Sequence, residues 1–172
     1  MEDRMPAGSR GDRQVFVYRF DFGGGEREVV SLLESDWAFR HGLRADGILG
    51  SVRAGANPDD LGPADVEEND VFVRLLSTVV QDNIGQSDFL RREARKQGAG
   101  YVYLIDGRTS NPGGRVPPED ILGAVEVKDG QGVAGSYRHN PRHRLLTAAG
   151  WFRLPDELES ALQRRLRVRT AD

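Results

Sequence analysis

The stretch Gly100-Tyr101-Val102-Tyr103-Leu104-Ile105-Asp106 alternates aromatic and branched apolar side chains and ends at an acidic residue. β-Branched and aromatic residues favour extended structure, and the alternation places both tyrosines on one face of a strand. The tyrosines therefore either belong to a core or line a cleft. A loop rich in turn residues follows, and Leu122 to Lys128 predicts a second strand that ends at the turn signal Asp129-Gly130.

Other elements are predicted on both sides of this stretch. The expected strands cover residues 15–22, 71–80, 101–105 and 122–128, and the expected helices cover 26–40, 87–96 and 155–167. Ser87 is typical of a helix N-cap, and Gly98 is typical of a helix end. These elements predict an α+β fold, a single domain over residues 14–172 with a split, mostly antiparallel β-core and flanking helices. Residues 1–13 are expected to be disordered.

Composition excludes several kinds of site. The chain has 172 residues, no cysteine and three histidines, so it has no disulfide framework and a zinc site is not expected. No apolar run reaches the length of about 20 residues that a membrane span needs. The first residues lack the apolar segment of a secretory signal. We therefore expect a cytoplasmic protein with no membrane contact.

Four segments, taken in order, resemble the ADP-ribosyltransferase fold of the cholera, pertussis and pierisin group. They are Tyr18-Arg19-Phe20-Asp21, Leu76-Ser77-Thr78-Val79, Tyr101-Val102-Tyr103 and the block from Pro112 to Ala124. The block contains a Gly-rich turn, Pro118-Glu119-Asp120-Ile121 and the start of a strand. Together they span about residues 15–130. The resemblance implies a fold that binds NAD.

The resemblance also implies roles for individual residues. Arg19 would hold the phosphate or ribose region of NAD, because a guanidinium is always charged and donates bidentately. The hydroxyls of Ser77 and Thr78 would brace the cleft. Tyr18 and Tyr103 would lie at the cofactor. From the residues alone, Arg19 is equally a strand arginine paired with a nearby acid, and Leu76 to Val79 also fits a plain half-buried strand.

The chain departs from the family at its catalytic motif. The family places Glu-x-Glu or Gln-x-Glu a few residues before the Gly-rich turn, whereas residues 107–111 contain no carboxylate. The nearest carboxylate is Asp106, and Glu126 lies on the following strand; these two are the candidate catalytic groups. A carboxylate is needed there because cleavage of the nicotinamide–ribose bond develops positive charge.

The leading hypothesis is ADP-ribosyl transfer or NAD glycohydrolysis with a non-standard carboxylate. One alternative is an inactive module of the same fold that binds a partner, and another is a biosynthetic enzyme that uses the same cleft for other chemistry. The segment Arg138 to Arg144 is the densest in cationic residues and predicts either a phosphate-bearing ligand or a loop packed on the sheet edge. No strong nucleic-acid signal is present.

Overall fold

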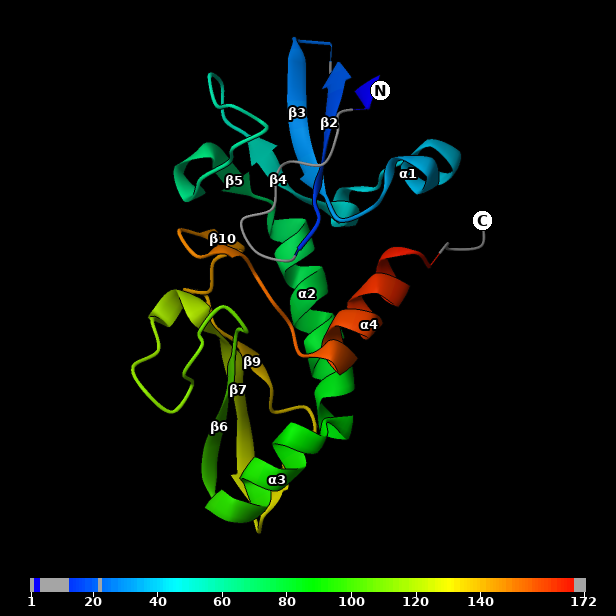
Figure 1. Cartoon of the computed structure of the whole chain (residues 1–172). Helices are drawn as coiled ribbons and strands as arrows, with labels where there is room; N and C mark the ends of the chain where they lie inside the picture. Colours follow the sequence, from blue (N-terminus) through cyan, green and yellow to red (C-terminus); the bar gives the residue numbers. More distant parts are fainter. Residues whose placement is uncertain (1, 4–12, 22, 169–172) are drawn as a thin grey trace. The chain divides into compact units, whose positions relative to one another are not determined.

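The computed structural model describes residues 2–3, 13–21 and 23–168, and its helices and antiparallel sheets confirm the α+β class (Figure 1). The chain forms two compact units. The first comprises residues 1–75 and 145–151, and the second comprises 76–144 and 152–172. Most of the predicted disordered segment 1–13 lies outside the described residues. The single domain over 14–172 stays a prediction.

The first unit is built on a five-stranded antiparallel sheet. In order across the sheet its strands are β1 (Glu2–Asp3), β2 (Phe16–Asp21), β3 (Glu26–Ser31), β4 (Ile48–Val52) and β5 (Val66–Glu68). Helix α1 (Ser35–His41) follows β3, and β10 (Leu146–Thr147) and β11 (Gly150–Trp151) form a separate hairpin. Tyr18, Val29 and Ala38 form a buried cluster between the sheet and α1.

The predicted helix over 26–40 is wrong for its first half, which is strand β3. The triplet Gly23-Gly24-Gly25 makes a hairpin turn in which Gly23 and Gly25 have positive φ, and Asp21 pairs with Glu26 across it. The chain therefore reverses directly into a second strand, where β-branched Val29 and Val30 are buried. The second half of the prediction holds, because α1 ends at Gly42.

The predicted strand over 71–80 is also wrong: residues Asp70–Asn83 form helix α2. Its buried side chains recur at helical spacing and are Phe72, Leu75, Leu76, Val79 and Val80. Asn69 marks the start of the helix, because its side-chain oxygen accepts a hydrogen bond from the Val71 amide. Burial of a five-residue helical stripe therefore outweighs the strand propensity of the valines.

The second unit contains the two strands that the opening stretch predicts. β6 (Gly100–Ile105) pairs antiparallel with β7 (Ile121–Lys128), and β7 also pairs with β8 (Gln131–Gly132) and β9 (Arg138–His139). Strand β6 therefore lies at the edge of this sheet. Val102 and Leu104 are buried on one face, whereas Tyr101 and Tyr103 are exposed on the other.

Two helices of the second unit follow the sequence prediction closely. α3 (Asp88–Gln97) begins after Ser87, whose hydroxyl accepts a hydrogen bond from the Leu90 amide, and it ends at Gly98 with positive φ. α3 packs against the β6–β7–β8 sheet. α4 (Asp156–Leu166) buries one leucine stripe and has acids in its first turn and arginines in its last.

Candidate functional site

Asp106, a predicted catalytic residue, lies fully buried at the end of β6. Its Oδ1 accepts hydrogen bonds from the backbone amides of Arg108 (3.0 Å) and Arg153 (2.9 Å). Its Oδ2 accepts from Nη2 of Arg108 (3.0 Å) and lies 2.9 Å from Nε2 of His143. Both carboxylate oxygens are thus engaged within the protein, and we interpret Asp106 as a structural residue.

The charged partners around Asp106 are equally buried. The side chain of Arg108 is 1% exposed, and its Nη2 also donates to the carbonyl oxygens of Glu119 (3.3 Å) and Arg144 (2.7 Å). Asp120 lies 3.5 Å from Arg108 Nε and accepts a hydrogen bond from the Thr109 hydroxyl at 2.7 Å. This buried network joins the loops that follow β6, β9 and β11, and it occupies both carboxylate oxygens of Asp106.

Two opposing effects act on the pKa of Asp106. Desolvation by burial acts to raise it, but the hydrogen bond with His143 and the charge and amide of Arg108 outweigh that effect and hold the pKa below its usual value. The carboxylate is therefore charged at neutral pH. A lowered pKa is the opposite of what a general acid needs.

The segment Arg138 to Arg144 separates into exposed arginines and inward-facing histidines. His143 is buried against Asp106, and burial together with the neighbouring His143 lowers the pKa of His139 to about 4. Arg144 donates from Nη1 to the carbonyl oxygens of Pro141 and His143. His139 therefore adds no charge to a phosphate site at neutral pH, whereas the three arginines of this loop are exposed.

The predicted cofactor residues of the first unit lie on opposite faces of β2. Tyr18 is fully buried, and its hydroxyl donates to the Leu33 carbonyl at 2.6 Å, so this side chain is part of the core. Arg19 is partly exposed, and its Nε lies 3.7 Å from a carboxylate oxygen of Glu26 on the neighbouring strand. Neighbouring strand residues point to opposite faces, so Tyr18 faces the core while Arg19 faces outward, and the burial of Tyr18 argues against its predicted contact with a cofactor.

The predicted hydroxyls belong to a different element. Ser77 and Thr78 lie on helix α2 rather than on a strand, Ser77 half-buried and Thr78 exposed. They belong to the second unit, whereas Arg19 belongs to the first, so neither unit contains the whole predicted set. Glu126, the other candidate carboxylate, is half-buried on β7 opposite Tyr101, and paired residues of neighbouring strands share a face.

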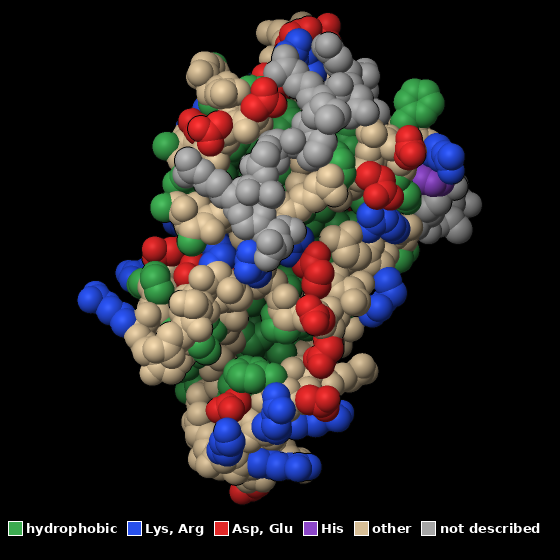
Figure 2. All heavy atoms as spheres, in the orientation of Figure 1, with side chains coloured by type: hydrophobic (Ala, Val, Ile, Leu, Met, Phe, Trp, Pro, Cys, Tyr) green, Lys and Arg blue, Asp and Glu red, His purple; other side chains and the backbone are tan. Residues whose placement is uncertain are grey.

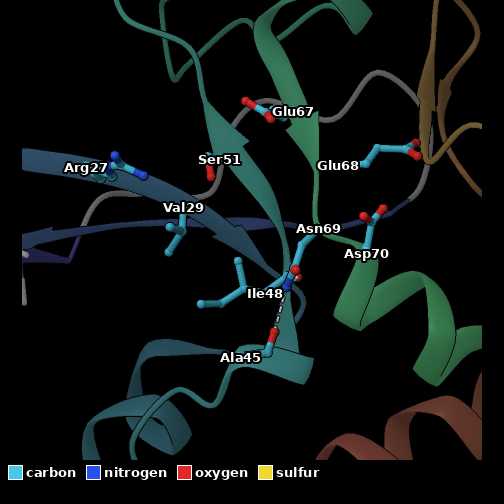
Figure 3. A pocket seen from close by; sticks show the side chains of 9 residues that line it. All are labelled: Arg27, Val29, Ala45, Ile48, Ser51, Glu67, Glu68, Asn69 and Asp70. Carbon is cyan, nitrogen blue, oxygen red and sulfur yellow. Dashed lines mark hydrogen bonds between the residues drawn. The ribbon is translucent and has the colours of Figure 1, made fainter.

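The first unit has an open cleft of about 630 Å³ (Figure 3). Two of its polar side chains are already hydrogen-bonded to the backbone of the first unit. Asn69 donates to the carbonyl oxygens of Ala45 and Ile48, and Glu68 accepts from the Leu145 amide. Arg27, Glu67 and Asp70 supply the remaining charge. Carboxylates from a single acidic stretch beside one arginine do not define a ligand.

The second unit has a groove of about 560 Å³ between the free edge of β6 and helix α3. We name it the β6–α3 groove and define it by Phe89, Glu93, Gln97, Tyr101, Tyr103 and Ile105. The three helical residues are spaced four apart and so lie on one side of α3. Phe89, Tyr101 and Tyr103 are 39%, 54% and 56% exposed, which is unusual for side chains of this size.

A smaller apolar pocket of about 180 Å³ adjoins the groove at its Ile105 end. The pocket shares Phe89, Ile105 and Pro112 with the groove and is closed by Ile84 and Leu104. Together, the groove and the pocket combine an aromatic surface with a recess for one apolar group. The sequence indicated the tyrosines, but the place of Phe89 beside them depends on how α3 packs.

Comparison with known proteins adds no assignment: no family model, curated protein or solved structure matches this chain. Within the part of the chain that the structure describes, no three His, Cys, Asp or Glu side chains are grouped so as to hold a metal ion. None of the described helices has the length and apolar character needed to cross a membrane.

Proposed function

We propose that this chain is a non-catalytic binding module and that the β6–α3 groove is its ligand site. The observation that carries the proposal is the exposure of three large aromatic side chains around one groove: Phe89, Tyr101 and Tyr103. Contiguous apolar surface on a protein is a mark of a binding site, and tyrosine is enriched at such sites because its ring is apolar and its hydroxyl is polar.

A binding role agrees with the state of the predicted catalytic groups. Asp106 is buried and fully bonded, and the chain lacks the family's Glu-x-Glu. The ADP-ribosyltransferase-like fold and the use of NAD stay predictions of the sequence. Incubating the full chain with NAD and measuring nicotinamide release tests them, and release above that of a blank would overturn the non-catalytic assignment.

Display of random peptides on phage tests the groove directly. The full chain is the immobilised target, and the variants are Tyr103→Ser in the groove and Phe39→Ser as a matched control. Phe39 is 82% exposed, belongs to the first unit and does not line the groove. We expect enriched peptides whose affinity falls by about tenfold or more with Tyr103→Ser and is unchanged with Phe39→Ser.

Two results would overturn the proposal. One is the absence of any enriched peptide. The other is enrichment of peptides that bind the Tyr103→Ser variant as tightly as the unmodified chain. Thermal unfolding of both variants shows whether the second unit remains folded, so that a loss of binding is assigned to the groove.

A further inference from the structure

Among the strands that the structure describes, none pairs with the outer side of β6. The sheet order is β6-β7-β8, and β9 pairs with β7, so β6 pairs with a strand on its β7 side only. An unpaired strand edge presents a row of amide and carbonyl groups that can bind another extended chain. The groove lies along this edge, because β6 and α3 supply seven of its lining residues; the loop 112–116 and Ile121 supply the rest.

The pairing of β7 shows which residues of β6 face outward. The backbone amide and carbonyl of Glu126 both point away from β6: the amide donates to the Ser136 hydroxyl, and the carbonyl accepts from the Val133 amide. Tyr101 is the partner of Glu126, so this is a pair without mutual hydrogen bonds. By alternation, the backbones of Tyr101 and Tyr103 point to the free edge; so does that of Ile105, because the next amide, of Asp106, bonds inward to the Asp120 carbonyl.

The protein itself supplies a donor to the first of these residues. Nε2 of Gln97 donates to the carbonyl oxygen of Tyr101 at 2.7 Å and to that of Ala99 at 2.9 Å. This contact confirms that the Tyr101 carbonyl points outward. Among the described residues, no backbone or side-chain group bonds to the outward amides and carbonyls of Tyr103 and Ile105.

We propose that an extended peptide segment of a partner protein adds to the second unit as a strand alongside β6. This inference rests on the proposed function, because it names the partner of the same groove. The amide and carbonyl groups of Tyr103 and Ile105 form the new ladder. The partner's side chains alternate between the tyrosine face and the α3 side of the groove.

The two sides of the groove set the side chains that the peptide needs. On the outer face, Tyr101 and Tyr103 offer aromatic rings for packing. On the α3 side, the apolar pocket of about 180 Å³ behind Phe89 accepts one apolar side chain of the size of leucine. The partner segment therefore carries an apolar residue at the position that faces this pocket.

Charge around the groove favours an acidic partner. Lys and Arg side chains gather over the part of the molecule where α3 lies (Figure 2). Arg92 and Lys96 follow Phe89 by three and seven residues and so lie on its side of the helix, and Arg115 lies between two residues that line the groove. Lys128 shares the face of β7 that carries Glu126.

Lys96 and Glu93 are paired with each other at 3.4 Å, which leaves three cations, Arg92, Arg115 and Lys128, against the one anion Glu126. All four cationic side chains are exposed. We therefore expect aspartate or glutamate at the ends of the bound segment to strengthen binding.

The test uses one designed peptide of alternating threonine and leucine with an aspartate at each end. Two derivatives carry N-methyl groups, one on every threonine and the other on every leucine. Because strand addition uses the amides of alternate residues, we expect one derivative to lose about tenfold or more in affinity and the other to bind like the parent. Binding of the parent should slow amide exchange at Tyr103 and Ile105.

A pair of protein variants tests the same ladder from the other side. Tyr103→Val and Tyr103→Pro both remove the aromatic ring, but only Tyr103→Pro also removes the backbone amide hydrogen. That amide points to the free edge and makes no hydrogen bond to β7, so its loss leaves the β6–β7 pairing intact. Edge strands tolerate proline at such positions. We expect Tyr103→Pro to bind the peptide about fivefold more weakly than Tyr103→Val, with both variants unfolding at similar temperatures.

The outcomes separate this inference from the proposed function. Strand addition is overturned if both N-methyl derivatives have equal effects or if the parent peptide does not bind. The proposed binding site still stands in that case if the display experiment yields peptides whose binding depends on the groove. Tighter binding of a peptide with lysine ends overturns the acidic partner. If the chain forms a concentration-dependent dimer that Tyr103→Pro abolishes, the occupant of the β6 edge is a second copy of this chain, and the proposal of a partner peptide is overturned.

Discussion

Nε2 of His143 lies 2.9 Å from Oδ2 of Asp106, and both side chains are almost completely buried. The two residues are 37 positions apart in the chain, so this contact ties the end of β6 to the loop after β9. Arg108 adds a charge to the same carboxylate, which makes the cluster an ion pair supported by hydrogen bonds. The stability of the second unit should therefore depend on Asp106.

Replacing Asp106 with alanine should destabilise the chain strongly. The substitution leaves the buried guanidinium of Arg108 without its nearest carboxylate, and loss of one partner of a buried pair costs about 3–5 kcal/mol of unfolding free energy. Urea unfolding measures the effect. Glu126→Gln is the control, because Glu126 is half-buried on the exposed face, and it should change stability by less than about 1 kcal/mol. A stable Asp106→Ala variant would contradict the structural role.

The pH dependence of stability should carry a contribution from His139. Burial and the neighbouring His143 lower the pKa of His139 from 6.5 to about 4. The unfolded chain therefore takes up a proton at higher pH than the folded chain does. The contribution of His139 is fully present above pH 6.5 and is lost as the pH falls to about 4.

Comparison with His139→Phe isolates this contribution. The linkage limit is about 3 kcal/mol, and solvent screening of the partly exposed ring reduces it to on the order of 1 kcal/mol. The wild-type unfolding free energy, measured by urea titration across this range, should fall more steeply than that of the variant. Parallel curves for the two proteins would show that His139 titrates normally in the fold.

Tyr18→Phe should lower stability rather than ligand binding. The hydroxyl of Tyr18 donates to the Leu33 carbonyl at 2.6 Å within the core of the first unit. Its removal leaves a buried carbonyl with one donor fewer, at a cost of about 1–2 kcal/mol. Thermal and urea unfolding measure this loss. A variant of unchanged stability that has lost affinity for NAD would restore the predicted role of Tyr18 at a cofactor.

Gly123→Ala should disrupt the pairing of β9 with β7. A β-carbon at Gly123 would collide with the Arg138 carbonyl and with the ring of Tyr137, both of which belong to the segment that packs on β7. A backbone collision cannot be relieved by a rotamer change, so we expect a loss of about 2 kcal/mol or more. Gly85→Ala is the control, because a β-carbon there meets no atom within 4 Å.

The sequence predicted the parts of the fold that have unambiguous local signals. Strand β6 has strict alternation, α3 has a serine cap and a terminal glycine, and the leucines of α4 repeat at helical spacing. In each case propensity, pattern and end signals agree. The edge position of β6 was not predictable, because it depends on which strands pair across long stretches of chain.

The errors arose where local signals disagreed. In α2, the valines and Phe72 favour a strand by type, but Leu75, Leu76, Val79 and Val80 are spaced for a helix, and packing of that stripe decided the outcome. β3 begins with three charged residues and then buries three consecutive residues, so it lacks the alternation that marks a strand. Asp106 was predicted as a catalytic group from its place at a strand end, but its partners His143 and Arg153 are brought to it only by tertiary structure.

The side chain of Gln97 limits what can attach to this protein. The side-chain amide of Gln97 donates to the Tyr101 carbonyl, where a neighbouring strand would otherwise donate. The part of the β6 edge that stays unpaired is therefore short. Uncontrolled stacking of copies needs a long unprotected border. Because the Gln97 amide occupies the Tyr101 carbonyl, the unpaired part of β6 is limited to Tyr103 and Ile105, which is a short border for copies of the chain to stack on.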